Sequence, residues 1–415
     1  MQKKVTKSYE ISRHLIMEAY SRVKSSNGGS GIDTISLSAF DEHLKDNLYK
    51  LWNRMSSGSY FPSAVKVVEI PKSNGGTRSL GIPTVSDRIA QMVAVMVLEP
   101  LLEPVFHSDS FGYRPHRSAH DALSKARDRC WWHNWVVDMD ISKFFDSIDH
   151  ELLFRSLRRH TDCKWVLLYI RRWLDVPYCR QNGEVEYRTK GIPQGSVIGP
   201  LLANLYLHYA FDMWMQKSFP HIPFERYADD CVCHCKSQHE AIRLKHGISK
   251  RLAECKLALN EEKTRIVFCK NSRRWDTYRP VSFDFLGYTF KPRESVDKSG
   301  VHFTGYLPAI SRKAKVHIMD TVRSWKLKSH TQHNLNSIAE MINPFLRGWI
   351  EYYGKFYPSV LKSFLRRRIN RVLAGWIRRK YKRFRDNYKK ACKWLETISK
   401  RDPALFYHWQ WGALP

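Results

Sequence analysis

Apolar and polar residues alternate with two different periods up to about residue 290. Apolar side chains at helical spacing, such as Ile11, Leu15, Ala19 and Val23, predict amphipathic helices. The helices are predicted over residues 1–24, a segment ending at Leu51, 86–106, 149–174, a segment from GIPQGSVIGP to about Met215, and 238–255. Short apolar runs predict strands over 65–70, 135–141, both halves of FERYADDCVCHCK, LNEEKTRIVF and FDFLGYTF. Interleaved helices and strands indicate an α+β fold.

Turn signals add two hairpins and one boundary. PKSNGGTRSLGIP follows the strand at 65–70 and predicts a hairpin with a basic returning strand, and Asn182-Gly183 predicts the turn of another hairpin. Beyond residue 305 the pattern becomes helical and rich in Arg, Lys, Trp and Tyr. The polar segment 292–304, which contains Pro and Gly, therefore predicts a domain boundary.

The net charge of the chain indicates which class of partner the protein binds. The 415 residues carry 69 Lys and Arg against 40 Asp and Glu, a formal net charge of +29, which favours a polyanion such as nucleic acid. A membrane is disfavoured because the apolar stretch from Ile89 to Leu98 is too short to span and contains Gln91. We expect no secretory signal, because MQKKVTKSYE leads into an amphipathic pattern rather than an apolar stretch. Its nine scattered cysteines favour reduced thiols in a cytoplasm.

Two segments place carboxylates at the end of an apolar strand. In VVDMDISKFFD, Asp138 and Asp140 share one face of the strand, and in RYADDCVCH the adjacent Asp229 and Asp230 can both reach one site from a hairpin turn. Oxygen ligands without His or Cys suit Mg²⁺. Two such ions about 3.5–4 Å apart would clamp an in-line phosphoryl displacement. Spacing alone leaves open the alternative that these aspartates face water.

The three cysteines after Asp230 raise the question of a second metal site. Cys231, Cys233 and Cys235 lie on one face of the predicted strand, with Cβ atoms roughly 6.5–7 Å apart along it. Ligands of one zinc ion each lie about 2.3 Å from the metal, which this spacing does not readily allow. We therefore predict small buried hydrophobic residues here and a surface or packing role for His234.

The order of the motifs resembles one protein family. The chain contains SNGGSGID, IPKSNGGTRSLGIPTVSDRIAQ, SFGYRPHRSAHDAL, WVVDMDISKFFDSIDH, GIPQGSVIGPLLANLYL, RYADDCV, LNEEKTRIV and FDFLGYTF in this order, followed by INPFLRGWIEYYGKFY and LFYHW. This set resembles the reverse transcriptase/maturase proteins encoded by bacterial group II introns. The resemblance extends over nearly the whole chain.

The resemblance implies an architecture. It implies a right-hand polymerase, α+β in class, with fingers and a palm built on an antiparallel sheet, followed by an α-helical thumb and maturase region. We assign residues 1–64 to an N-terminal extension and the start of the fingers, 65–295 to the fingers and palm, and 305–415 to the helical thumb and basic RNA-binding region. Because no CxxC pair follows LFYHWQWGALP, we expect no HNH endonuclease domain.

The resemblance also implies roles at a catalytic centre. Asp140 and Asp229 match the ligands of two Mg²⁺ ions, and Asp230 completes the acidic site; Asp138 and Asp146 are read as supporting residues. The residues expected to contact the incoming dNTP are Lys72, Arg78, Phe145, Gln194 and Lys263. Phe145 matches the bulky residue that excludes a ribose 2′-OH, with a plain core aromatic as the alternative. Lys72 and Arg78 would hold phosphate through charge-assisted hydrogen bonds, or they are solvated surface cations.

The segment from Leu361 to Lys393 combines a basic face with an apolar face. Its cations predict binding to an RNA backbone, with a solvated charged helix as the alternative. The predicted RNA-binding residues are Arg366, Arg367, Arg368, Arg371, Arg378, Arg379, Lys380, Lys382, Arg383 and Arg385.

The resemblance implies an RNA-directed DNA polymerase of the bacterial cytoplasm. Its expected partners are group II intron RNA, a DNA primer or target and dNTPs, and it would assist splicing as a maturase and copy the intron into cDNA during retrohoming. One alternative is a domesticated relative that copies a dedicated non-coding RNA in phage defence or DNA repair. Another is an RNA-binding splicing factor with a degenerate polymerase site, which the intact DMDISKFFD and YADD pairing disfavours.

Overall fold

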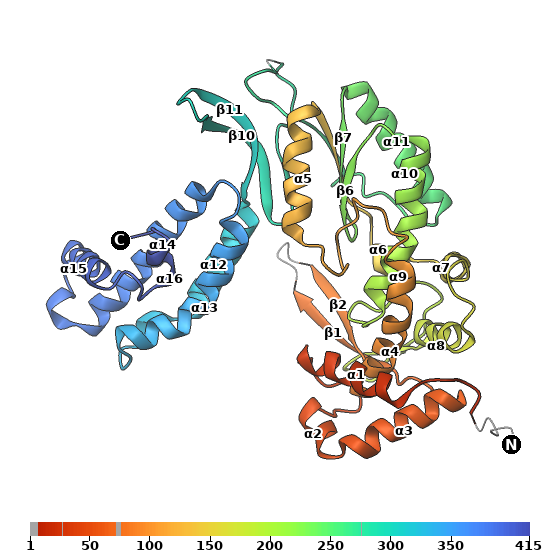
Figure 1. The fold of residues 1–415 in the computed structure, drawn as a ribbon. Coiled ribbons are helices and arrows are strands. Elements are labelled where there is room, and N and C mark those ends of the chain that lie inside the picture. The colour runs from red at the N-terminus through yellow and green to blue at the C-terminus, as the bar shows by residue number, and fades with distance from the viewer. Residues whose placement is uncertain (1–6, 27, 72–75, 275) are drawn as a thin grey trace. The chain divides into compact units, whose positions relative to one another are not determined.

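The computed structural model describes residues 7–26, 28–71, 76–274 and 276–415, and its chain forms two compact units (Figure 1). The first unit comprises residues 1–122 and 137–265, and the second comprises 123–136 and 266–415. The domains predicted from the sequence are functional regions of a polymerase, whereas these two units are defined by compactness. The predicted domain limits therefore stay predictions. Among the described residues, no helix is both long and apolar enough to cross a membrane.

The first unit is predominantly helical. Its helices are α1 (Arg13–Ser25), α2 (Leu37–Glu42), α3 (Leu44–Ser57), α4 (Val85–Leu102), α6 (Phe144–Ser147), α7 (His150–Leu157), α8 (Lys164–Asp175), α9 (Gly199–Leu207), the π-helix η1 (His208–Asp212), α10 (Met213–Ser218) and α11 (Gln238–Glu254). Helix α5 (Ala119–Trp132) lies mainly in the second unit. The helix predicted to end at Leu51 is divided into α2 and α3, and α3 continues to Ser57, where Gly58 with a φ of 79° caps its end.

The single helix predicted over 149–174 is wrong. The chain forms α7 and α8 with a loop between them. In that loop the Thr161 hydroxyl accepts a hydrogen bond from the backbone N–H of Cys163 at 3.2 Å. Such a local side-chain bond competes with continued helix.

A small sheet in the first unit carries the basic hairpin. Its strands are β1 (Val65–Pro71), β2 (Thr77–Ile82), β4 (Tyr178–Cys179) and β5 (Val185–Glu186), in the order β2-β1-β4-β5. Strands β1 and β2 pair antiparallel, as the sequence predicts. The turn between β4 and β5 contains Gly183 with a φ of 83°, which confirms the predicted Asn-Gly turn.

The strands of the acidic motifs lie together. Strand β7 (Asp230–Cys235) lies between β6 (Phe224–Tyr227) and β3 (Trp135–Met139), and β6 and β7 pair antiparallel. Cys231, Cys233 and Cys235 are fully buried, which confirms their prediction as core residues, and burial raises the pKa of the Cys231 thiol. His234 is also fully buried, and its Nε2 lies 2.6 Å from a carboxylate oxygen of Glu225. Both faces of β7 are therefore covered.

The second unit begins with a sheet. Strand β8 spans Arg265–Phe268 and is not part of this sheet. The sheet is formed by β9 (Phe283–Phe285), β10 (Tyr288–Val296) and β11 (His302–Ile310), in the order β11-β10-β9. The segment 292–304, predicted as a boundary, instead forms much of the β10–β11 hairpin, which pairs from Tyr288↔Ile310 to Val296↔His302. The polar residues there indicated a linker, but half-exposed antiparallel strands tolerate polar residues equally well.

The rest of the second unit is helical, as predicted. Its elements are α12 (Arg312–Ser324), η2 (Leu327–Ser329), α13 (Leu335–Tyr353), α14 (Pro358–Lys380), η3 (Lys382–Phe384), α15 (Tyr388–Arg401) and α16 (Tyr407–Gln410). These elements share one core that includes the fully buried Trp376 and Trp409. The Asn370 side-chain oxygen accepts a hydrogen bond from the Trp409 indole at 2.9 Å and lies 2.8 Å from His408 Nε2. The LFYHW motif is therefore a packing element of this core.

Candidate active site

The turn between β6 and β7 presents the paired aspartates. Tyr227 pairs with Asp230, so Ala228 and Asp229 alone form the turn, which confirms the predicted tight hairpin. Ala228 has a φ of 58°, the left-handed conformation that two-residue hairpin turns require. Asp229 occupies the turn and Asp230 begins β7, and both are partly buried.

A buried arginine supports this turn from β6. The guanidinium of Arg226 donates from Nε and Nη2 to the two carboxylate oxygens of Asp212, at 2.7 and 2.6 Å, and both side chains are fully buried. Its Nη1 donates to Asn204 Oδ1 at 3.0 Å and to the carbonyl of Ala228 at 3.1 Å. A rigid, fully paired guanidinium thus fixes the backbone immediately before Asp229.

The segment FGYRP (residues 111–115) packs against the same turn. The N–H of Phe111 donates to the carbonyl of Arg226 at 2.8 Å. The carbonyl of Gly112 accepts from Asn204 Nδ2 at 2.6 Å. A Cβ at Gly112 would lie 2.4 Å from the backbone nitrogen of Ala228, so only glycine permits this approach.

Asp140 directly follows the last residue of β3, and residues 260–264 hold it through hydrogen bonds and an ion pair. The N–H of Asn260 donates to the Asp140 carbonyl at 2.8 Å, and the Asp140 N–H donates to Thr264 Oγ1 at 3.3 Å. The Lys263 ammonium lies 3.2 Å from Asp140 Oδ2. The sequence-predicted Lys263 therefore lies at the site, where it contacts the Asp140 carboxylate.

Electrostatic coupling connects Asp229 with Asp140. Burial raises the pKa of Asp229, and the negative charge of Asp140 raises it further. The cations of Arg78 and Arg226 oppose this rise. The pKa of Tyr113 is also raised, first by burial and then by the charge of Asp229. Asp140, Asp229, Arg78 and Tyr113 thus influence one another through one acidic site.

Arg78 and Gln194 meet although 116 residues separate them. The Arg78 guanidinium donates to Gln194 Oε1, and Gln194 Nε2 donates to Asp146 Oδ1 at 3.5 Å. The Gln194 carbonyl accepts from the N–H of Gly81 in β2 at 2.7 Å. The structure therefore brings the basic hairpin and the GIPQG turn together. The predicted Lys72 lies outside the described residues.

Phe145 in α6 packs against the start of the same GIPQG segment. Its carbonyl accepts from the N–H of Ile192 at 2.7 Å, and its ring lies 5.4 Å from that of Phe144. A Cβ on Gly191 would lie 2.8 Å from the carbonyl oxygen of Asp146. The side chain of Phe145 is only partly buried, and its role against a ribose 2′-OH stays a prediction.

The acidic residues fit hard cations in donor type. Asp140 and Asp229 offer carboxylate oxygens, and the Lys263 contact shows that a cation can lie against Asp140. Within the described ranges, however, no three His, Cys, Asp or Glu side chains gather closely enough to hold one ion. Asp230 makes an interaction of its own and stays a predicted member of the site.

Family models match two stretches of the chain. The model "Reverse transcriptase (RNA-dependent DNA polymerase)" matches residues 70–290, more than half of the chain. The chain belongs to this reverse transcriptase family. The model "Group II intron, maturase-specific domain" matches residues 316–394 of this reverse transcriptase. The predicted fold class and the activity of an RNA-directed DNA polymerase are thereby confirmed.

Curated relatives agree with this assignment. The reverse transcriptase is 33% identical to protein YkfC of Escherichia coli over 57% of its own length and 71% of that protein. It is 34% identical to the group II intron-encoded protein LtrA of Lactococcus lactis over 46% of its length and 32% of LtrA. It therefore spans about a third of LtrA. Telomerase from Candida albicans aligns over 90% of this chain with 13% identity and a TM-score of 0.46, a likeness too weak to support an argument.

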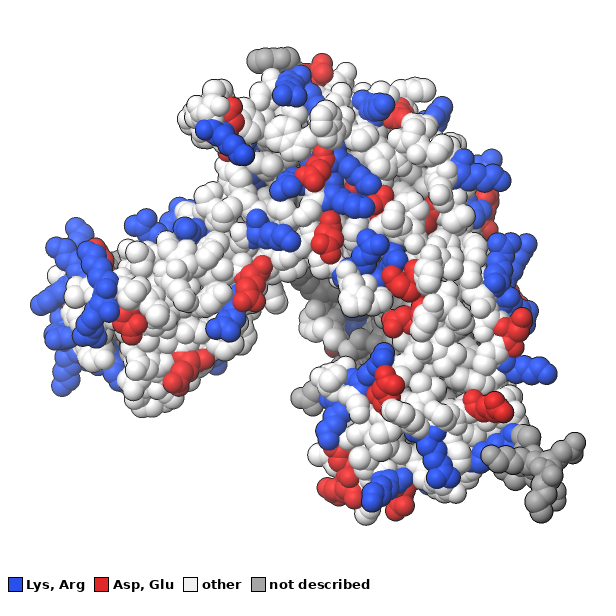
Figure 2. Space-filling view, viewed as in Figure 1, with Lys and Arg blue, Asp and Glu red and all other residues white. Residues whose placement is uncertain are grey.

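The predicted RNA-binding cations lie on α14 and the turn after it. Figure 2 shows Lys and Arg gathered over the end of the molecule that carries α14 and α15. The exposed members are Arg366, Arg367, Arg368, Arg371, Arg379, Lys382, Arg383 and Arg385. Arg378 donates to the carbonyl of Arg385, and Lys380 Nζ donates to the carbonyls of Thr331 and His333 at 2.8 and 2.7 Å. These two cations therefore support the local fold of the reverse transcriptase.

Several residues at the site were not predicted from the sequence. Arg226 and the turn that it supports are contacted by Asp212, Asn204 and Gly112. The one sequence signal for this group is the position of Arg226 at the start of RYADD. Arg188 stacks over Tyr178, with its Cζ 4.1 Å from the ring centroid. Its Nε and Nη2 are buried and have no hydrogen-bond partner among the described residues.

Proposed function

We propose that this reverse transcriptase uses two Mg²⁺ ions held by Asp140 and Asp229, with Asp230 completing the site, to copy RNA into DNA. The observation that supports the proposal is the strand arrangement: Asp229 lies in the turn between β6 and β7, Asp140 directly follows β3, and β3 lies next to β7 in the same sheet. When bound, the ions would polarise the phosphate and stabilise its developing charge. Reverse transcriptases as a family use divalent metal ions.

The chain's own residues would position the nucleotide. Arg78 and Gln194 form one contact pair beside Asp146, and an incoming triphosphate would take over the Arg78 guanidinium. Lys263 would release Asp140 when an ion binds there and would then be available to phosphate. The primer-extension test is direct: purified protein should extend a DNA primer on an RNA template only with Mg²⁺ present, and metal-independent extension would contradict the proposal.

The partner of the basic helix would be group II intron RNA. The maturase-specific match at residues 316–394 and the similarity to LtrA support splicing assistance and cDNA synthesis during retrohoming. Exposed arginines of α14 and a pocket of about 280 Å³, lined by Phe364, Arg367, Arg368 and Arg371, support contacts to RNA. Sequencing the RNA that co-purifies with the protein tests this, because an unrelated RNA population would contradict the maturase role.

Neutralising exposed cations of α14 should weaken RNA binding. In the variant Arg366→Gln/Arg367→Gln/Arg368→Gln/Arg371→Gln, we expect the slope of log K against log salt to fall by about 3, because four phosphate contacts are lost. Affinity is measured by filter binding over a range of salt concentrations. The control is Lys45→Gln/Lys50→Gln/Arg54→Gln on α3, which removes three exposed cations from another helix. An unchanged slope in the α14 variant would refute the assignment.

Phe145→Ala should raise incorporation of ribonucleotides. Removing the partly exposed ring would make room for a 2′-OH, and a steric contact of this kind is worth on the order of 10–100-fold in selectivity. The measurement is the ratio of kcat/KM for dATP and ATP in primer extension. Phe144→Leu is the control, because Phe144 is buried and directed to the core. Unaltered sugar selectivity in Phe145→Ala would remove Phe145 from this role.

A further inference from the structure

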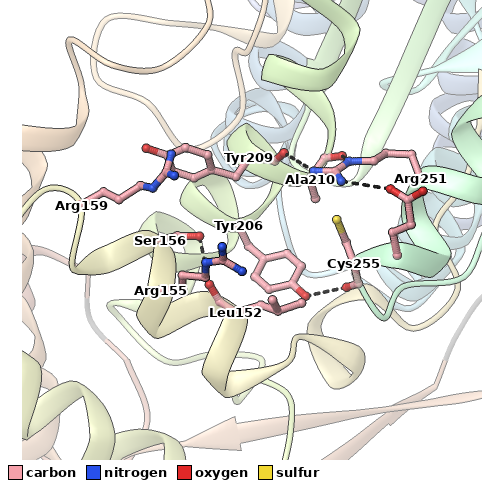
Figure 3. A pocket seen from close by; sticks show the side chains of 10 residues that line it. Leu152, Arg155, Ser156, Arg159, Tyr206, Tyr209, Ala210, Arg251 and Cys255 are labelled. Carbon is pink, nitrogen blue, oxygen red and sulfur yellow. Dashed lines mark hydrogen bonds and ion pairs between the residues drawn. The ribbon is translucent and has the colours of Figure 1, made fainter. Parts of the chain in front are cut away.

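A second pocket lies in the first unit, apart from the acidic turn. It has a volume of about 390 Å³ and is built from α7 with the turn after it, the junction of α9 with η1, and the end of α11 (Figure 3). None of the residues proposed to bind metal or nucleotide lines it. Its size suits a small organic ligand.

Positive charge dominates the walls of this pocket. Arg155 and Arg159 are exposed, and no carboxylate among the described residues forms an ion pair with either. Arg251 pairs with Glu254, with Nη1 3.2 Å from a carboxylate oxygen. The pocket lining thus carries three guanidinium groups but one carboxylate, that of Glu254. Unpaired guanidinium groups favour an anion with several acceptor oxygens, such as phosphate.

The π-helix η1 fixes the wall opposite α7. Arg251 donates from Nη2 to the carbonyl of Tyr209 at 3.0 Å and from Nε to the carbonyl of Ala210 at 3.1 Å. A π-helical segment displaces carbonyls from the regular α-helical bonding pattern, and such segments are frequent at functional sites. Arg251 therefore has a structural role, whereas Arg155 and Arg159 keep their donors for a ligand.

Two tyrosines give the pocket a rigid aromatic surface. The hydroxyl of Tyr206 donates to the carbonyl of Cys255 at 2.6 Å. The hydroxyl of Tyr209 lies 2.7 Å from His160 Nε2, and the Arg159 guanidinium lies 5.3 Å from the Tyr209 ring centroid. The Tyr209 ring is only partly buried. A planar base could stack on this ring beside the arginine.

We propose that this pocket binds one nucleotide of a single-stranded RNA, with its phosphate between Arg155 and Arg159 and its base against Tyr209. Charge, aromatic surface and volume together match a phosphate joined to a base. The choice of RNA as the source rests on the proposed function, in which the protein holds an RNA larger than its template site requires. The pocket would then anchor a strand away from the catalytic turn.

A charge-reversal pair tests the phosphate contacts. The probe is a fluorescein-labelled single-stranded RNA of about 20 nucleotides, titrated with the full chain and followed by anisotropy. For Arg155→Glu/Arg159→Glu we expect about tenfold weaker binding and a salt slope lower by about 1.4, that is about 0.7 for each of two contacts. The matched control is Lys50→Glu/Arg54→Glu, an exposed pair with the same spacing and charge change on α3. Equal effects of the two pairs would overturn the proposal.

Photo-crosslinking locates the strand. RNA containing 4-thiouridine should crosslink to a peptide containing Tyr209 in the wild type and the control, but not in Arg155→Glu/Arg159→Glu. Absence of this crosslink from the wild type would overturn the proposal. Complete competition by excess AMP would overturn it in favour of a free mononucleotide.

Primer extension separates this proposal from the polymerase assignment. On a pre-annealed template–primer at saturating concentration, Arg155→Glu/Arg159→Glu should extend at the wild-type rate, because the pocket lies outside the acidic site. Loss of extension in this variant would overturn a pocket role distinct from catalysis. Absence of extension by the wild-type protein would instead contradict the proposed function and leave the binding result in place.

Discussion

Asp229→Asn is expected to reduce cDNA synthesis by about 10³-fold while the protein stays folded. Asparagine keeps the shape of the side chain but removes the negative charge that a divalent cation requires, and an ion at such a site stabilises the transition state by several kcal/mol. Because the pKa of Asp229 is raised by burial and by Asp140, loss of its charge also relieves a repulsion and should not destabilise the fold. Asp140→Asn should have an effect of similar size.

The measurement is single-turnover extension of a DNA primer on an RNA template with Mg²⁺. Asp320→Asn is the matched control, because Asp320 is an exposed carboxylate that forms an ion pair with the exposed Arg323 at 2.7 Å. This control should extend the primer at the wild-type rate. If Asp229→Asn or Asp140→Asn also extended at that rate, the assignment of these carboxylates would be wrong.

Arg226→Ala is expected to lower the free energy of unfolding by about 3–5 kcal/mol. The substitution leaves the fully buried Asp212 carboxylate without its partner, and an uncompensated buried charge is costly. It also removes the donor to the Ala228 carbonyl, so the turn that carries Asp229 loses its support. Urea unfolding followed by fluorescence measures the first effect, and primer extension measures the second.

Two variants separate stability from positioning. Lys245→Ala breaks a partly exposed ion pair with Glu261 and should cost about 0–1 kcal/mol. Arg226→Met/Asp212→Leu removes both buried charges and should recover most of the lost stability, but extension should stay low because Ala228 and Asn204 still lack their donor. A cost below about 1 kcal/mol for Arg226→Ala would show that the ion pair between Arg226 and Asp212 does not stabilise the fold in this way.

Local features of the site were predictable from sequence. The two-residue turn of RYADDCV, the Asn-Gly hairpin and the buried cysteines all follow from period-two alternation and turn chemistry, and the structure confirms each. The change to a helical pattern was predicted beyond residue 305 from its periodicity in the same way; in the structure strand β11 extends to Ile310, and the helices begin at Arg312.

The sequence was ambiguous where one local pattern is compatible with two different structures. The polar segment 292–304 was predicted as a boundary but forms a strand pair, because strands with one exposed face also carry polar residues. His234 lies on the face opposite the cysteines, and the sequence left both a surface role and a packing role open for it. It is buried because that face of β7 is covered as well, and Glu225 satisfies its Nε2.

The sequence by itself determined the family, the fold class and the two acidic motifs, because these depend on short ordered segments whose spacing can be inspected directly. Only the tertiary structure decided which side chains meet. Asn204 reaches Gly112 across 92 positions and Lys263 reaches Asp140 across 123, and neither contact leaves a local pattern. The pocket beside Arg155 likewise arises from α7, η1 and α11 coming together. The physical reason is that packing brings distant residues into contact at distances that sequence spacing does not encode.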